Sequence, residues 1–232
     1  MRRLAVSATL LLVLVVSSGA SAGDGKQLFG RYCAKCHGPD ARGTSRGPSL
    51  IGAGGLAADF YLRTGYMPLK ANGQQPRRSR LLLGPAEIDA LVHYVAELGH
   101  GPAVPRPHPA RGNVSEGMAL FRQHCAGCHQ IVAEGGYVTH AVPPALGDAT
   151  PTQVAEAVRI GPYVMPRFST AAISTRQLDS IIRYVRYARH PDNRGGWALG
   201  NIGPIPEGLV SWFIAGSVLL ATCLLIGKRL RA

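Results

Sequence analysis

The chain has 232 residues, including 29 glycines and 17 prolines, and only 6% of its residues are aromatic. This length accommodates two small domains with much loop, and such domains seldom bury enough apolar surface unaided, so we expect a large bound group to complete each core. The formal net charge is +12. The sequence contains no nucleic-acid-binding motif, which excludes that class of function. The positive charge then indicates a solvated surface, an acidic protein partner or contact with anionic lipid headgroups.

Residues 1–22 have the pattern of a secretory signal peptide. Two arginines precede an apolar run from Leu4 to Val16, and the segment ends in the small-residue stretch 20–22, Ala-Ser-Ala. The alternative is a retained membrane anchor, but a run of about 13 apolar residues is shorter than the about 20 that a span requires. We therefore expect export, with a mature chain that begins near Gly23.

The residues that follow predict helices and no strand. A short helix is expected to lead into the motif Cys33-Ala34-Lys35-Cys36-His37, and another covers residues 57–63. Pro85 suits the first turn of a third helix, in which apolar side chains recur at i, i+3, i+4 and i+7 as far as Leu98. No segment alternates with the period of two that marks a half-buried strand, so the expected fold class is all-α.

Two stretches lack a helical pattern. Residues 69–84 carry Arg77, Arg78 and Arg80 and are interpreted as a surface loop. Residues 100–115 contain four prolines in close succession, which no helix or central strand tolerates, and they are interpreted as a linker.

Residues 116–192 repeat the organisation of the first domain. The motif returns as Cys125-Ala126-Gly127-Cys128-His129, the pair Met67-Pro68 as Met165-Pro166, and residues 89–95 as 179–185. Three matches in the same order indicate a duplicated domain.

Cys-x-x-Cys-His is the signature of covalent haem attachment, because two thiols one helical turn apart form thioethers with the haem vinyl groups while the adjacent imidazole binds the iron. Zinc is disfavoured because zinc ribbons space their Cys pairs by about 15 to 20 residues. A thioredoxin-like dithiol lacks its βαβ context, and disulfides leave the histidines unexplained. The two copies predict two haem c groups, one on Cys33, Cys36 and His37 and one on Cys125, Cys128 and His129.

Met67 and Met165 are the predicted sixth ligands of the two irons. A lone methionine more often fills a core, but these two recur at equivalent places and are two of only four methionines. His93 and His140 are rival ligands. His/Met ligation raises the reduction potential and leaves no open position on the iron, so we expect electron relay and no catalytic residue.

Other side chains near the motifs have open interpretations. Pro48 and either Pro143 or Pro144 are expected to shape the loop that backs each motif histidine. Four further side chains either donate hydrogen bonds to haem propionates or face solvent: Arg63, Tyr66, Arg159 and Tyr163.

Residues 209–227 are predicted to cross a membrane. They carry no charge, and the basic tail 228–232 follows directly. The positive-inside rule places that tail in the cytoplasm and the haem domains outside. Trp212 and Phe213 then fall near the outer interface. A buried helix of a soluble protein is the alternative, which the basic tail disfavours.

The order of motif, Pro-x-Leu loop, Met-Pro and amphipathic helix resembles class I cytochrome c domains over nearly all of residues 24–190. The segment 193–208, from Asn193 through Gly195-Gly196-Trp197 to Gly208, resembles the pre-membrane signature of the dihaem cytochrome c subunit of the actinobacterial menaquinol:cytochrome c reductase, the cytochrome bcc complex. The boundaries that we expect are 1–22 for the signal peptide, 23–99 and 116–192 for two tandem class I cytochrome c domains, 100–115 for the linker, 193–208 for the pre-membrane segment, 209–227 for a single C-terminal transmembrane helix and 228–232 for the tail.

The resemblance implies an electron-transfer subunit of a quinol–cytochrome-c reductase with no substrate chemistry of its own. It implies a Rieske iron–sulfur subunit and a cytochrome b subunit as partners, cytochrome c oxidase as the acceptor, and contact with membrane lipid but not with nucleic acid. The alternatives are a cytochrome subunit of a membrane-bound dehydrogenase and a free membrane-anchored dihaem cytochrome.

Overall fold

The computed structural model describes residues 24–191 and 204–231. The predicted signal peptide lies outside the described residues, as does most of the expected pre-membrane segment.

The chain forms two compact units, and each is described by itself. Among the described residues, the first unit holds 24–72 and 77–103, and the second holds 73–76 together with everything from Val104 onward. Within these described ranges the regular structure is helical and no strand occurs, apart from the isolated bridges Thr44–Gly47 and Val138–Ala141. The all-α prediction is confirmed.

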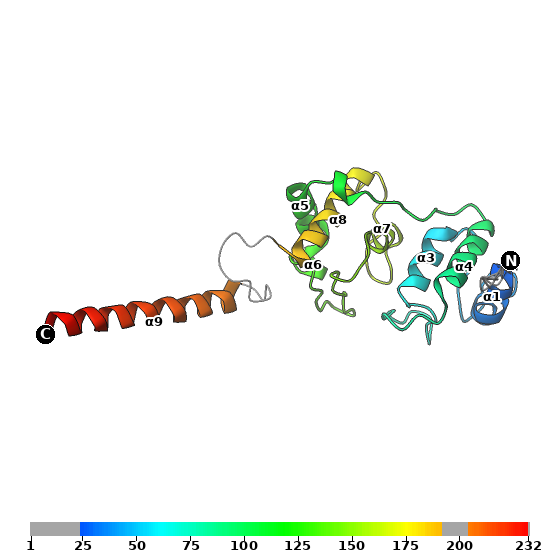
Figure 1. Cartoon of the computed structure of the whole chain (residues 1–232). Coiled ribbons are helices and arrows are strands. Elements are labelled where there is room, and N and C mark those ends of the chain that lie inside the picture. Colours follow the sequence, from blue (N-terminus) through cyan, green and yellow to red (C-terminus); the bar gives the residue numbers. More distant parts are fainter. Residues whose placement is uncertain (1–23, 192–203, 232) are drawn as a thin grey trace, which may run out of the picture. The chain divides into compact units, whose positions relative to one another are not determined.

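Local hydrogen bonds cap two helices of the first unit. Asp24 caps the first helix by accepting a hydrogen bond from the backbone N–H of Lys26. The last helix starts at Pro85, as expected, and Glu87 accepts the backbone N–H of Gly84. The described helices of this unit are α1 (Gly25–Tyr32), α2 (Ala34–His37), α3 (Gly54–Arg63) and α4 (Pro85–Glu97) (Figure 1).

The second unit repeats these elements and adds two. Its longest domain helix is capped by Ser174, which accepts from the N–H of Gln177 while the Gln177 amide accepts from Ser174 N–H, a reciprocal capping box. The described elements are the 3₁₀ helix η1 (Pro109–Arg111), α5 (Val114–His124), α6 (Ala126–His129), α7 (Pro151–Ile160), α8 (Thr175–Arg189) and α9 (Pro204–Arg231).

The first and last helices of each domain cross at a glycine. A Cβ on Gly25 of α1 would collide with the Ala90 carbonyl of α4, and a Cβ on Gly117 of α5 would collide with the Ser180 carbonyl of α8. The glycines therefore allow the two backbones to approach closely, which a side chain would prevent.

An aromatic pair packs beside each crossing. The ring centroids of Phe29 and Tyr94 lie 5.3 Å apart and those of Phe121 and Tyr184 lie 5.4 Å apart, with interplanar angles of 49° and 52°. Both phenylalanines are fully buried. The two units thus share one core design, as the sequence repeat predicts.

The expected linker is partly structured. Pro102 accepts the backbone N–H of Leu56 at 3.0 Å in the first unit. In the second unit, η1 packs against α8, where Asp179 accepts the N–H of His108 at 2.7 Å and Ser180 accepts the N–H of Asn113 at 3.0 Å. Both ends of the proline-rich segment are therefore bound to a domain.

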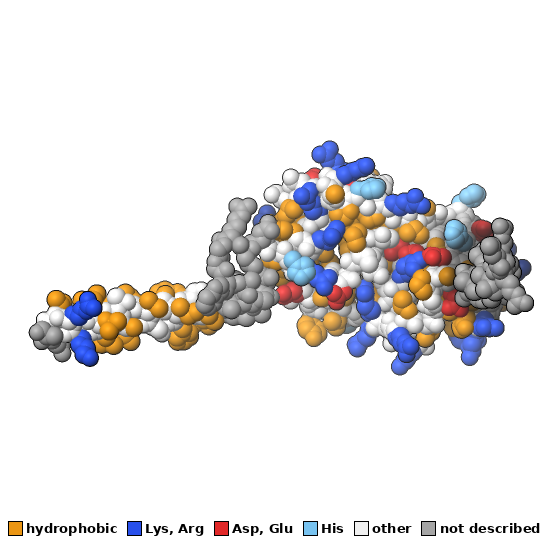
Figure 2. All heavy atoms as spheres, viewed as in Figure 1, with side chains coloured by type: hydrophobic (Ala, Val, Ile, Leu, Met, Phe, Trp, Pro, Cys, Tyr) orange, Lys and Arg blue, Asp and Glu red, His pale blue; other side chains and the backbone are white. Residues whose placement is uncertain are grey.

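The helix α9 contains a 23-residue segment, Gly208–Leu230, that is long and apolar enough to cross a membrane. Figure 2 shows apolar side chains along α9 and basic side chains near its C-terminal end. The exposed fractions of Trp212 and Phe213 are 79% and 73%. Large apolar side chains left uncovered over such a length favour a lipid environment over water.

Candidate haem-attachment sites

The first motif forms a single helical turn directly after α1. The backbone N–H of Cys33 donates to Phe29 O at 2.8 Å, and the N–H groups of Cys36 and His37 donate to Cys33 O at 3.1 and 3.0 Å. The two cysteines therefore lie one turn apart, and both are free thiols. This is the spacing that two thioether bonds to one haem require.

The second motif has the same geometry after α5. Cys125 N–H donates to Phe121 O at 2.8 Å, and Cys128 and His129 donate to Cys125 O at 3.1 and 2.9 Å. Both of its cysteines are free thiols. The sequence repeat is thus also a repeat of backbone hydrogen bonds.

Each motif histidine is fixed through one ring nitrogen. His37 Nδ1 lies 2.8 Å from Pro48 O, and His129 Nδ1 lies 3.0 Å from Pro144 O. A carbonyl oxygen only accepts hydrogen bonds, so Nδ1 carries the proton and Nε2 presents its lone pair. Metal-binding histidines are commonly oriented in this way.

The loops that supply these carbonyls are held close to the motifs. Leu50 N–H donates to Ala41 O at 2.8 Å, and Leu146 N–H donates to Ala133 O at 2.9 Å. Thr44 Oγ1 donates to Cys36 O at 2.6 Å, and a Cβ on Gly47 would come within 3.2 Å of His37 Nδ1. The first loop therefore packs against the motif without space for a side chain at position 47.

Burial also raises the pKa of one thiol in each motif. It raises the pKa of Cys33 to about 11, with a smaller contribution from the neighbouring Cys36, and it raises the pKa of Cys125 to about 11, with a smaller contribution from Cys128. Redox-active dithiols need a lowered thiol pKa, so the thioredoxin-like alternative is disfavoured. Burial also lowers the pKa of His129, which favours the neutral imidazole that binds metals.

The zinc alternative gains no support from the geometry. Among the described residues, no group of three or more His, Cys, Asp or Glu side chains is placed to hold a metal ion. Each motif contributes instead two thiols and one oriented imidazole, a donor set that fits covalently bound haem.

The two methionines occupy different surroundings. Met165 packs half-buried against the core of the second unit, as does Cys125. Met67 follows α3, and its backbone N–H donates to Tyr61 O at 3.2 Å. The rival His140 has a backbone φ of 65° and accepts a hydrogen bond from the Tyr163 hydroxyl through its carbonyl.

The arginines considered for the propionates have protein partners. Arg63 pairs with Asp59 at 2.7 Å and also with Asp89, which joins α3 to α4. Arg159 donates to the carbonyls of Phe168 and Ser169 at 3.0 and 2.9 Å. Both therefore stabilise their own domain.

Sequence reasoning missed Thr44 and left the choice between Pro143 and Pro144 open. The spacing between proline and leucine could have settled the choice between Pro143 and Pro144, because only Pro144 stands two residues before its leucine, as Pro48 does before Leu50. No comparable signal marks Thr44, since its contact depends on how the loop folds back.

Two helical units built on Cys-x-x-Cys-His, each with an oriented histidine, define a c-type cytochrome with covalently bound haem. The comparisons agree: residues 22–99 match the family model described as cytochrome c, and residues 112–185 match the model described as cytochrome C oxidase, cbb3-type, subunit III.

Similarity to curated relatives identifies the family within the c-type cytochromes more closely. The cytochrome bc1 complex cytochrome c subunit of Mycobacterium tuberculosis is 38% identical over 92% of this chain and 80% of its own length. That of Corynebacterium diphtheriae is 33% identical over 89% of this chain and 80% of its own. The cbb3-type oxidase subunit CcoP of Rhodobacter capsulatus is 29% identical over 69% of this chain and 60% of its own. The chain belongs to the family of cytochrome c subunits of the cytochrome bc1 complex.

Proposed function

We propose that the chain carries two haem c groups and relays electrons as the dihaem cytochrome c subunit of a respiratory quinol:cytochrome c reductase. The observation that carries the proposal is the pair of motifs in which two thiols lie beside a histidine whose Nδ1 faces a proline carbonyl. The similarity to cytochrome c subunits of the bc1 complex supports the choice of complex.

The roles of the residues follow from their chemistry. When bound, haem iron supplies one-electron redox chemistry. The loop carbonyls hold the rings of His37 and His129, whose Nε2 atoms would bind the iron. The thiols would form the thioether bonds to each haem: Cys33 and Cys36 in the first unit, Cys125 and Cys128 in the second.

Met67 and Met165 are proposed as the sixth ligands. A thioether ligand raises the potential relative to a second imidazole, which suits a carrier placed after a quinol. With such a ligand bound, the iron would have no open position for a substrate.

The proposed partners are a Rieske iron–sulfur subunit as donor, a cytochrome b subunit, and cytochrome c oxidase as acceptor. Lys228 and Arg229 at the end of α9 support a cytoplasmic C-terminus by the positive-inside rule, with both haem domains on the opposite side of the membrane. The relatives from the bc1 complex cover more of the chain than CcoP does and at higher identity, which favours this complex.

The haem count tests the proposal. The purified full chain should show two haem c groups per polypeptide in a pyridine haemochrome assay, and haem staining should survive denaturing electrophoresis. Changing Cys36→Ala and Cys128→Ala together should abolish the stain, while Cys223→Ala, in α9, should leave it unchanged. A stoichiometry of one haem per chain contradicts the two-haem proposal, and purification without b-type haem from native membranes contradicts the assignment to this complex.

A further inference from the structure

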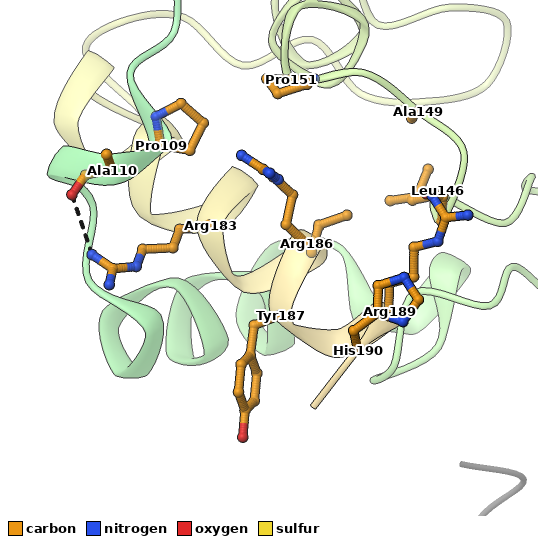
Figure 3. A pocket seen from close by; sticks show the side chains of 12 residues that line it. Pro109, Ala110, Leu146, Ala149, Pro151, Arg183, Arg186, Tyr187, Arg189 and His190 are labelled. Atoms are coloured by element: carbon orange, nitrogen blue, oxygen red, sulfur yellow. Dashed lines mark hydrogen bonds between the residues drawn. The ribbon is translucent and has the colours of Figure 1, made fainter. Parts of the chain in front are cut away.

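A cavity of about 530 Å³ opens on the second unit, and its lining includes none of the eight proposed haem-site residues (Figure 3). Its walls come from η1, from the loop before α7, and from the C-terminal half of α8. Pro109, Leu146 and Pro151 provide an apolar wall, and α8 provides the basic one.

Three arginines line the cavity, and no acidic residue does. Arg183 donates to the carbonyls of Ala110 and Gly112 at 3.2 and 2.7 Å, which joins α8 to η1. Arg189 donates to Gly147 O at 2.6 Å and pairs with Asp148 at 3.1 Å, which joins α8 to the loop before α7. These two side chains therefore build the frame of the cavity.

Arg186 lies between them and has a different environment. It is exposed, and no hydrogen bond or ion pair joins it to another described residue. In Figure 3 its guanidinium extends into the space between Pro109 and Pro151. Among the described residues, Arg186 is thus the cavity arginine whose guanidinium is available to bind an anion.

The fold itself does not require these arginines. Asp89 of α4 corresponds to Asp179 of α8, so the positions that correspond to Arg183, Arg186 and Arg189 are His93, Ala96 and Gly99. The first domain forms the same helix crossing with no arginine in this row. The three arginines of α8 that line the cavity are therefore specific to the second domain.

We propose that this cavity binds the phosphate group of an anionic phospholipid. A planar guanidinium matches phosphate oxygens well, and the apolar wall suits the glycerol and upper acyl carbons. His190 on the wall is joined to Gly208, the first residue of the apolar span, by residues 191–207 alone. Fully extended, that segment reaches at most about 60 Å, so the cavity is tethered within that distance of the membrane span.

Titration calorimetry of the haem-loaded full chain in an uncharged detergent tests the proposal. Dihexanoyl-phosphatidylglycerol should bind and dihexanoyl-phosphatidylcholine should not. Arg186→Ala should weaken phosphatidylglycerol binding about tenfold, the loss of one charge-assisted hydrogen bond. Arg176→Ala is the matched control, because Arg176 is an exposed arginine in the first turn of the same helix and does not line the cavity.

All variants retain α9, so any lipid that binds to that helix contributes equally to each titration. Equal affinity of wild type and Arg186→Ala for phosphatidylglycerol overturns the proposal. Inorganic phosphate that binds as tightly as phosphatidylglycerol overturns the lipid assignment, and an oligoglutamate peptide that binds more tightly overturns it in favour of an acidic protein surface. Unchanged haem absorption in Arg186→Ala confirms that the variant is folded, and this readout is independent of the proposed electron relay.

Discussion

The imidazole of each motif histidine donates to a main-chain oxygen, and this one bond determines which nitrogen can bind a metal. In both units the acceptor is the carbonyl of a proline that stands two residues before a leucine. The sequence predicted that a proline-containing loop backs each histidine, and the structure shows that the proline carbonyl accepts the hydrogen bond from Nδ1. The methionine that we propose as the sixth ligand in each unit is the part of the site that a replacement tests most directly.

Met165→His should lower the potential of the second haem. Replacing a thioether by a second imidazole removes the stabilisation of the reduced iron, and a shift on the order of 0.1 V fits the ~0.8 V range that axial ligands span. A spectroscopic redox titration measures it. Met118→His is the control, because Met118 is 41% exposed on α5. An unchanged titration for Met165→His rules out Met165 as a ligand.

Tyr184→Phe should lower the free energy of unfolding by about 0.5 to 1.5 kcal/mol, because the Tyr184 hydroxyl donates to Ile131 O at 2.5 Å and the variant leaves that carbonyl unpaired. Tyr94→Phe, at the equivalent place in the first domain, should change little, since no hydrogen bond joins the Tyr94 hydroxyl to a described residue. Guanidinium unfolding of the full chain measures both. Equal losses in the two variants would contradict this account.

At the scale of helices, the two domains depend on a crossing that only glycine permits. Gly25→Ala should destabilise the first domain by about 1 to 3 kcal/mol, the usual cost of overpacking, because its Cβ would collide with Ala90 O and come within 2.9 Å of Tyr94 Cβ. Thermal unfolding followed by circular dichroism measures the loss.

Gly30→Ala provides the control on the same helix. A Cβ at Gly30 meets nothing within 4 Å, and alanine is the better helix former by roughly 0.5 to 1 kcal/mol. This variant should be as stable as the wild type or more so. A comparable loss in both variants would show that α1 does not tolerate alanine for reasons other than the crossing.

Local elements were predictable from the sequence, and contacts between distant segments were not. Pro85 marks a helix start through its own backbone chemistry, so this start was identified before the fold was known. The cavity behind Arg186 was missed because η1, the loop before α7 and α8 come together only when the chain folds. The 3₁₀ helix in the expected linker was missed for the same reason, since its prolines alone indicate only an absence of helix.

At the scale of the whole molecule, we expect α9 to attach the chain to the membrane without being needed for the folding of the two domains. A chain that ends before Pro204 should keep both domains folded and lose its membrane attachment, because Gly208–Leu230 is the only span that the described residues offer. Carbonate extraction of membranes followed by haem staining measures the distribution. Recovery of the shortened, haem-stained chain in the membrane pellet would indicate a second attachment.

The carbonyls of Pro48 and Pro144 also affect how these domains respond to mutation. A main-chain oxygen is present whatever amino acid occupies the position, so no single replacement at 48 or 144 deletes the acceptor for His37 or His129. What does remove it is a change in the number of residues between histidine and acceptor, which moves the oxygen out of reach. The orientation of each motif histidine therefore depends on the length of this loop, and an insertion or deletion there should be more damaging than a substitution at position 48 or 144.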